Sequence, residues 1–295
     1  MSQKIEYEVN QREYVYYWIR LFFSTILYAA LIYGILVLTN LYNLYPAELN
    51  VILVYIAIIA IFAIFGILRF CIFIGYLKGN AVRITEKQFP EIYAKVANQS
   101  DLLGLTKIPK VYILQSGGFL NAYATRFFGS NYIVLFSEVV DAAYEQDKNV
   151  LEFIIGHELG HIKRKHLLKK MILFPSALIP FLRTAYSRAC EYTCDNIGYT
   201  LCPEGAQNGM LLLASGRGLF KKVNLKEYIS QSYTDDGFWF WISEKLSSHP
   251  HITKRLEVFG EKTIAKPVNK IKTEVEPTIE ESLKTNSDYS KYMPK

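Results

Sequence analysis

The stretch Phe153–His166, with the sequence FIIGHELGHIKRKH, decides how the rest of the chain is interpreted. It contains an H-E-x-x-H pattern made by His157, Glu158 and His161. Residues four apart lie on one face of an α-helix, so both imidazoles can reach a single metal ion. Glu158 lies one step round the helix, where it can accept a proton from water without binding the ion. The pattern predicts a metal site, and two unrelated histidines on a surface helix are the alternative.

Zinc suits this donor set, because it binds imidazole nitrogens and a carboxylate oxygen and leaves a fourth position for water. A third protein ligand must come from elsewhere. Glu191 and Asp195 are four apart on a predicted helix, so they share a face. Glu191 is a candidate ligand thirty residues after His161, and Asp195 would accept the second N–H of a ligand imidazole. An exposed acidic pair close to two arginines is the alternative.

The composition favours a folded chain with membrane-spanning segments. Of the 295 residues, 51% are hydrophobic and 15% aromatic, which supplies a core and long apolar runs. The net charge of +6 is modest, and no basic stripe is interleaved with aromatic residues, so no nucleic-acid partner is expected. The four cysteines form no C-x-x-C pair, so we expect reduced thiols in a reducing compartment.

Two uncharged runs near the N-terminus predict a membrane anchor over residues 1–80. We expect transmembrane helices at about 16–39 and 50–76, with Arg20 reaching back to the water interface, and no cleavable signal peptide. A buried helical hairpin is the alternative. Lysine and arginine flank both spans but are missing from the loop between them, so both termini are expected in the cytoplasm. The chain would be an integral protein of the inner or cell membrane, with 81–263 facing the cytoplasm.

Residues 81–263 are expected to form a mostly helical α+β domain with a small antiparallel or mixed sheet, before a flexible tail at 264–295. A capping pattern at Thr85–Gln88 would open its first helix. His166 is not expected as a metal ligand, because on an uninterrupted helix it points about 140° away from His161. The expected strands are 110–114, 119–127 and 132–136, and the expected helices are 86–103, 137–146, 147–170 and 184–199.

Four separated pieces of the sequence occur in the order found in one known family. They make the chain resemble the M48 family of membrane zinc peptidases over about residues 82–260. The resemblance implies a gluzincin-type metallopeptidase domain. The four pieces are Asn121-Ala122-Tyr123-Ala124, His157 to His161, Ser187 to Asp195, and Ser248 to Arg255.

The resemblance also implies roles for individual residues. One zinc ion per chain would be bound, with Glu158 as the general base. His249 would donate to the oxyanion formed on the substrate carbonyl, and Arg255 would brace the site. Asn121–Ala124 would be an edge strand on which an extended polypeptide substrate adds through its backbone. The implied zinc ligands are His157, His161 and Glu191.

The function implied is that of an HtpX-like, membrane-anchored zinc endopeptidase that hydrolyses peptide bonds of membrane or misfolded proteins. Ste24-like processing of CAAX prenyl proteins is the enzymatic alternative, and a catalytically silent zinc-binding scaffold or holdase is the other. Too few spans are predicted for the enclosed chamber of the prenyl-protease branch, which favours the HtpX-like function. Met171–Leu182 is shorter than the hairpin usual in HtpX-like members. The expected partners are polypeptide substrate and membrane lipid, and no oligomeric state is predicted.

Overall fold

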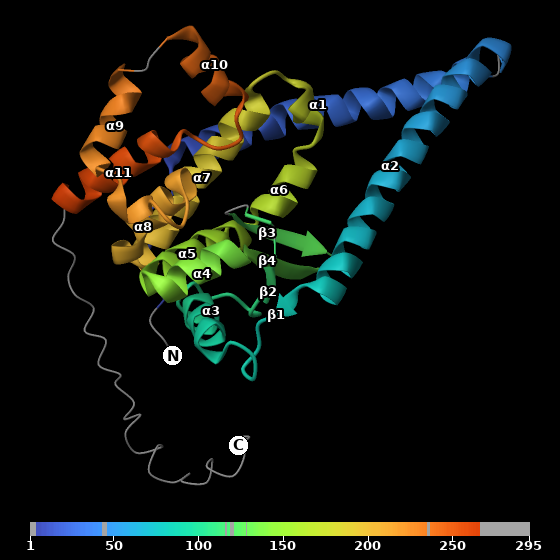
Figure 1. Ribbon diagram of the computed structural model, residues 1–295. Helices are drawn as coiled ribbons and strands as arrows, with labels where there is room; N and C mark the ends of the chain where they lie inside the picture. Colours follow the sequence, from blue (N-terminus) through green and yellow to red (C-terminus); the bar gives the residue numbers. More distant parts are fainter. Residues whose placement is uncertain are drawn as a thin grey trace, which may run out of the picture. The chain divides into compact units, whose positions relative to one another are not determined.

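The computed structural model describes residues 4–42, 46–115, 117–118, 121–127, 129–234 and 237–265. Nearly all of them belong to one compact unit, Met1–Gly260, which is the unit described below. Two long helices precede a mostly helical region with a small mixed sheet (Figure 1). The predicted tail at 264–295 lies outside the described residues apart from the end of α11. The α-helices are α1 (Gln11–Tyr42), α2 (Pro46–Asn80), α3 (Pro90–Leu102), α4 (Ser137–Glu145), α5 (Lys148–Lys163), α6 (His166–Ile172), α7 (Leu182–Leu201), α8 (Pro203–Ser215), α9 (Leu225–Thr234), α10 (Phe238–Leu246) and α11 (Ile252–Ala265).

Four strands form a sheet in the order β1-β2-β4-β3, where β1 is Val82–Arg83, β2 Lys110–Leu114, β3 Ala122–Phe127 and β4 Ser130–Phe136. The predicted hairpin is confirmed, because β3 pairs antiparallel with β4, whereas β2 runs parallel to β4. Central β4 is largely buried, and β3 lies at an edge with no further strand beside it among the described residues. The sheet therefore has an open backbone edge along β3.

The helix that carries the H-E-x-x-H pattern is broken, so the prediction of one helix over 147–170 is wrong. Asp147 begins α5, since its side chain accepts a hydrogen bond from the backbone N–H of Asn149. At the other end Lys165 adopts a left-handed conformation with φ of 55°, and α6 starts anew at His166. A left-handed residue reverses the course of the chain at a helix end. His166 therefore leaves the direction that an uninterrupted helix would give it.

Close packing of α5 on α7 fixes the position of the motif helix. A methyl group added at Gly160 of α5 would lie 3.2 Å from the Cα of Cys194 on α7. Such a contact is tighter than ordinary packing, so the two backbones approach closely because no side chain separates them. Two turns earlier on nearly the same face of α5, Phe153 is buried, lies against Gly198 of α7, and packs its ring edge-on against Phe259 of α11. The motif helix is thus held in place along its length before any polar contact is considered.

The two long helices carry the predicted spans inside them. Gln11–Leu41 and Asn50–Asn80 are long and apolar enough to cross a membrane, by length and composition. Most of their large apolar side chains are exposed in the monomer, as expected for segments that face lipid. The expectation for Arg20 is wrong, however. Its side chain is buried, and it donates hydrogen bonds to Ser176 Oγ at 2.9 Å and to the Leu173 carbonyl at 2.7 Å.

Arg20 therefore attaches α1 to the 3₁₀ helix η1 (Pro175–Leu178), which follows α6. A second short 3₁₀ helix, η2 (Phe220–Lys222), lies after α8.

The predicted helix start at Thr85 is also wrong. Thr85 and Gln88 exchange backbone hydrogen bonds in a tight turn, and α3 begins only at Pro90, where proline is favoured in a first helical turn.

Candidate active site

His157, His161 and Glu191 converge on one point between α5 and α7. His157 Nε2 lies 3.4 Å from Glu191 Oε2, and His161 Nε2 lies 3.5 Å from Glu191 Oε1. One donor atom from each of the three residues falls within 4.8 Å of the others. A tetrahedral zinc ion at about 2.1 Å from each donor holds the donors roughly 3.4 Å apart. The spacing in this cluster therefore fits such an ion, and all three side chains are nearly buried.

The charge of the cluster also fits a cation. Burial alone would raise the pKa of Glu191, but His161, together with hydrogen bonds from His157 and His249, holds it well below its usual range. A carboxylate that stays ionised in a buried site needs nearby positive charge. Glu191 is thus available as an anionic donor beside two imidazoles.

His157 is oriented by a buried acid. Its Nδ1 lies 2.9 Å from Asp195 Oδ1, so Nδ1 carries a proton that Asp195 accepts. The other ring nitrogen, Nε2, faces Glu191 and is the atom that would bind a metal ion. Arg255 donates two hydrogen bonds to Asp195, from Nε to Oδ2 at 2.7 Å and from an Nη to Oδ1 at 2.6 Å. Although burial would raise the pKa of Asp195, Arg255 lowers it below its usual value. The predicted positions of Asp195 and Arg255 therefore meet in one ion pair behind His157.

Glu158 is buried next to the cluster and beside the sheet. Burial raises its pKa to about 7, against the opposing effects of His157 and the backbone N–H of Ala124 on β3. A positive ion in the cluster would favour the carboxylate form. Glu158 therefore lies where α5 meets β3, and with a pKa of about 7 its carboxyl group can gain or lose a proton near neutral pH.

A cleft of about 770 Å³ opens in front of these residues. The sequence-predicted segment from Asn121 to Ala124 lines one side, with Ala122 as the first residue of β3 and Asn121 just before it. The two preceding positions of the predicted strand, 119 and 120, lie outside the described residues. The cleft is also lined by Arg20, Tyr123, His157, Glu158, His161, His166, Leu167, Lys170, Phe174, Ala177, Leu178, Arg183, Thr184, Ser187, Glu191, Ser248 and His249.

His249 stands at the mouth of the cleft with 60% of its side chain exposed. Its Nδ1 lies 3.0 Å from Glu191 Oε2. The loop that carries it is attached to α7 by Arg188, whose Nη1 donates to the backbone carbonyls of Glu244, Lys245 and Ser247 at 2.7–2.9 Å. His249 thus lies at the cluster, as the resemblance implied. The sequence analysis did not predict that Arg188 holds the loop that carries His249.

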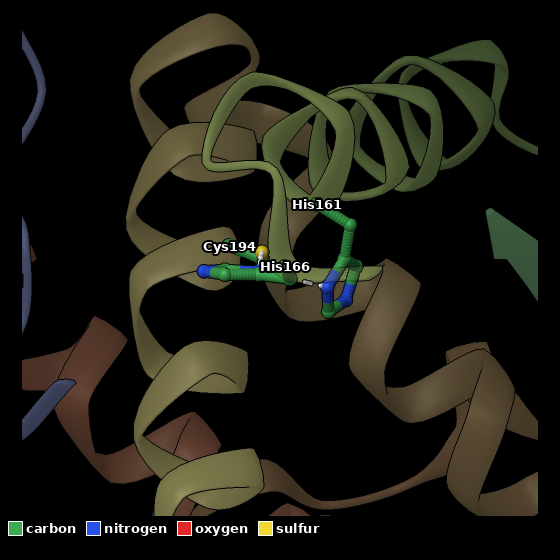
Figure 2. A group of neighbouring side chains, drawn as sticks. All are labelled: His161, His166 and Cys194. Atoms are coloured by element: carbon green, nitrogen blue, oxygen red, sulfur yellow. Dashed lines mark hydrogen bonds between the residues drawn. The ribbon is translucent and has the colours of Figure 1, made fainter. Parts of the chain in front are cut away.

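Sequence reasoning rejected His166 as the third metal ligand, a position that Glu191 takes in the cluster, but the direction assumed for the His166 ring is wrong. Because the helix breaks at Lys165, the ring of His166 turns back toward the site, and its Nδ1 lies 3.1 Å from His161 Nδ1. The same nitrogen is 3.6 Å from Cys194 Sγ (Figure 2). No glycine or proline marks the break, so the sequence around it carries no signal for this position.

Comparison with known proteins agrees with this geometry. The family model described as peptidase family M48 matches residues 85–179 and 174–262, which together cover more than half of the chain. A 65-residue stretch is 42% identical to the CAAX prenyl protease 1 homolog of Dictyostelium discoideum, covering 22% of this chain and 15% of that relative. The crystal structure of S. mikatae Ste24p aligns with a TM-score of 0.45 and 19% identity, over 82% of this chain and 66% of Ste24p. The chain thus matches only part of each relative's length, and by the family model it belongs to peptidase family M48.

Proposed function

We propose that this protein is a zinc-dependent endopeptidase anchored in a membrane through residues 1–80, with a gluzincin-type peptidase domain at 81–263 that faces the cytoplasm. The observation that supports it most is the spacing of the three donor atoms of His157, His161 and Glu191, 3.4–3.5 Å between each imidazole and the carboxylate. When bound there, zinc supplies a Lewis acid that polarises the scissile carbonyl and makes water more acidic.

The side chains of the cluster would then divide the work of peptide hydrolysis. His157 and His161 hold the ion through Nε2, and Glu191 balances its charge. Glu158 takes a proton from the attacking water and gives it to the leaving amine, a role that suits a carboxyl whose pKa is raised to about 7 by burial. The Asp195–Arg255 pair keeps His157 in one tautomer, so that no reorientation is needed during the reaction.

The substrate would bind as an extended polypeptide along β3. This strand has one free edge among the described residues, and Ala122–Ala124 line the cleft beside Glu158. Backbone pairing with an edge strand holds a peptide without selecting its side chains. His249, exposed at the cleft mouth, would donate a hydrogen bond to the carbonyl oxygen as negative charge develops there.

Membrane or misfolded proteins are the substrates that we favour, as in HtpX-like peptidases, since only two spans precede the site within the described residues. The stretch shared with a CAAX prenyl protease homolog favours a second candidate, the processing of prenylated CAAX proteins. Both candidates use the same cluster and differ in what the cleft accepts.

Cleavage assays on the full chain in detergent test this proposal. Casein and a farnesylated CAAX peptide should be offered to wild type and Glu158→Gln, each with and without a chelator, after the zinc content has been measured. Casein cleavage that needs about one zinc per chain and is lost in Glu158→Gln supports the endopeptidase. Cleavage of the prenylated peptide alone supports the second candidate. Cleavage that persists in Glu158→Gln contradicts the role of Glu158, and a zinc-loaded chain that cleaves neither substrate supports a silent scaffold.

A further inference from the structure

Glu13 is a buried acid in the first turn of α1, far from the motif helix in sequence but in contact with it in space. Its Oε1 lies 2.9 Å from an Nη of Arg164, 3.2 Å from His166 Nε2 and 3.4 Å from Lys169 Nζ. The side chain has no exposed surface. These three partners lie on both sides of the break at Lys165, so a single carboxylate of α1 joins the end of α5 to the start of α6.

His166 connects this carboxylate to the zinc cluster. The ring is fully buried, with Nε2 lying 3.2 Å from Glu13 Oε1 and Nδ1 lying 3.1 Å from His161 Nδ1. Figure 2 shows His166 beside both His161 and Cys194, which approach the same ring nitrogen, Nδ1. A continuous path of short contacts therefore runs from α1 through His166 to a zinc ligand.

The tautomers along this path are linked by their hydrogen bonds. His161 faces Glu191 through Nε2, so as a zinc ligand it carries its proton on Nδ1. That proton needs an acceptor, which His166 Nδ1 provides when the His166 proton is on Nε2. The carboxylate 3.2 Å from Nε2 is that of Glu13, which can only accept a proton or pair with a positive charge. Glu13 therefore favours a proton on Nε2, although the contact does not have full hydrogen-bond geometry. One carboxylate thus selects the orientation and tautomer of two rings.

We propose that Glu13 is a positioning residue for the zinc ligand His161 and acts on it through His166. The inference rests on the proposed zinc site and adds that the first membrane helix supplies part of its support. Carboxylates that receive the second N–H of a ligand imidazole raise metal affinity in the same way. Here the effect is passed through an intervening imidazole, because Glu13 does not itself reach His161.

A second metal ion is the competing explanation for this cluster, since donor atoms of His161, His166 and Cys194 lie within 4.8 Å of one another. Both nitrogens of His166 already face a partner at hydrogen-bond distance, however, and one of those partners is Glu13. We therefore interpret the cluster as a hydrogen-bonded path and treat a second ion as an outcome of the test.

Zinc affinity of the full chain in detergent is the measurement, made by competition with a chromophoric chelator. The variants are Glu13→Gln, His166→Phe, the double variant and Lys169→Met. Loss of a group that orients a ligand lowers metal affinity by about 10–100-fold, so we expect that range for His166→Phe and its lower end for Glu13→Gln. Lys169→Met removes another partner of the same carboxylate without touching His166, and its zinc affinity should match that of wild type.

The double variant separates positioning from general destabilisation. If Glu13 acts through His166, adding Glu13→Gln to His166→Phe lowers zinc affinity no further, because the path is already cut. His166→Asn keeps a polar group facing His161 and should recover part of the affinity. The cobalt absorption spectrum, which reports ligand geometry, should change in Glu13→Gln and not in Lys169→Met.

Three results would overturn the inference: additive losses in the double variant, equal losses in Glu13→Gln and Lys169→Met, or two zinc ions per wild-type chain. Unchanged affinity in Glu13→Gln would also end it while leaving the proposed peptidase intact. A wild-type chain that binds no zinc would instead overturn the proposed function itself. Thermal unfolding of each variant without metal identifies any variant that fails to fold, and His166→Asn then replaces His166→Phe.

Discussion

The two imidazoles that face Glu191 are supported by different parts of the chain. Behind His157 lies Asp195, fixed by two hydrogen bonds from Arg255 and contained within the peptidase region. Behind His161 lies a second imidazole, His166, and then a carboxylate that comes from α1. One support is a direct ion pair between neighbouring helices, and the other is a chain of contacts that begins in α1. The comparison shows that a pair of equivalent ligands can depend on unrelated segments.

The largest effect is expected from a substitution that removes the proton acceptor of the proposed reaction and leaves both ligand supports intact. In Glu158→Gln the two imidazoles and their partners stay in place, but no group accepts the proton of water. We expect kcat to fall by about 10²–10⁴-fold with zinc content unchanged, as general-base loss usually costs. Peptide hydrolysis and metal analysis on the same samples check this prediction, and zinc lost together with activity would contradict it.

The second-largest effect is expected when Asp195, the acid that contacts His157, loses its charge. Asp195→Asn breaks the buried ion pair of Arg255 and leaves it with the longer contact to Glu191 at 3.9 Å. Removing one partner of a buried pair costs up to about 3–5 kcal/mol. We expect lower thermal stability even without metal, and zinc affinity reduced by about 10–100-fold. Calorimetry of metal-free and metal-loaded protein separates the two effects. A variant as stable as wild type would mean that Arg255 finds another partner.

The His161 side should give a smaller and different response. Glu13→Gln keeps the size of the side chain, and its zinc affinity should fall less than in Asp195→Asn, because an imidazole lies between Glu13 and the ligand. Chelator competition on both variants, run in parallel, gives the ratio of the two effects. Equal losses would show that the direct ion pair has no advantage over the chain of contacts through His166.

The smallest effect on zinc affinity should come from a contact of α1 that involves neither Glu13 nor His166. Ser24 is buried, and its Oγ accepts a hydrogen bond from the backbone N–H of Ser176 at 3.3 Å. Ser24→Ala should lower stability by about 1 kcal/mol, the usual worth of a buried hydrogen bond, with zinc affinity unchanged. Thermal unfolding and chelator competition are again the measurements. A lower zinc affinity in this variant would attribute the His161 effect to docking of α1 in general.

The same comparison shows how far the sequence could predict this structure. Helical periodicity put Glu191 and Asp195 on one face of the next helix, but spacing alone favoured an exposed acidic pair. The position of Glu191 beside both histidines was implied by the resemblance to the M48 family. His166 was rejected because the prediction assumed one helix, and the break depends on Lys165, whose left-handed backbone no local residue type announces. Glu13 belonged to a short polar segment, where nothing local distinguishes a buried acid from a solvated one.

The sheet gives a similar lesson on a larger scale. β2 was predicted with the correct bounds, and the hairpin of β3 and β4 was recognised from its turn residues. The parallel pairing of β2 with β4 was not predicted, since it joins strands that are separated in sequence by β3. Long-range pairing of this kind depends on the whole core, whereas turn residues act locally.

The docking of α1 has a consequence for shortened versions of this protein. A fragment that starts at residue 81 retains every ligand of the cluster and still matches the family model. It would nevertheless remove the carboxylate that pairs with the partly buried basic groups of Arg164 and Lys169 and leave His166 without its anion. Removal of residues 1–80, in the cell or in the laboratory, should therefore weaken the proposed zinc site.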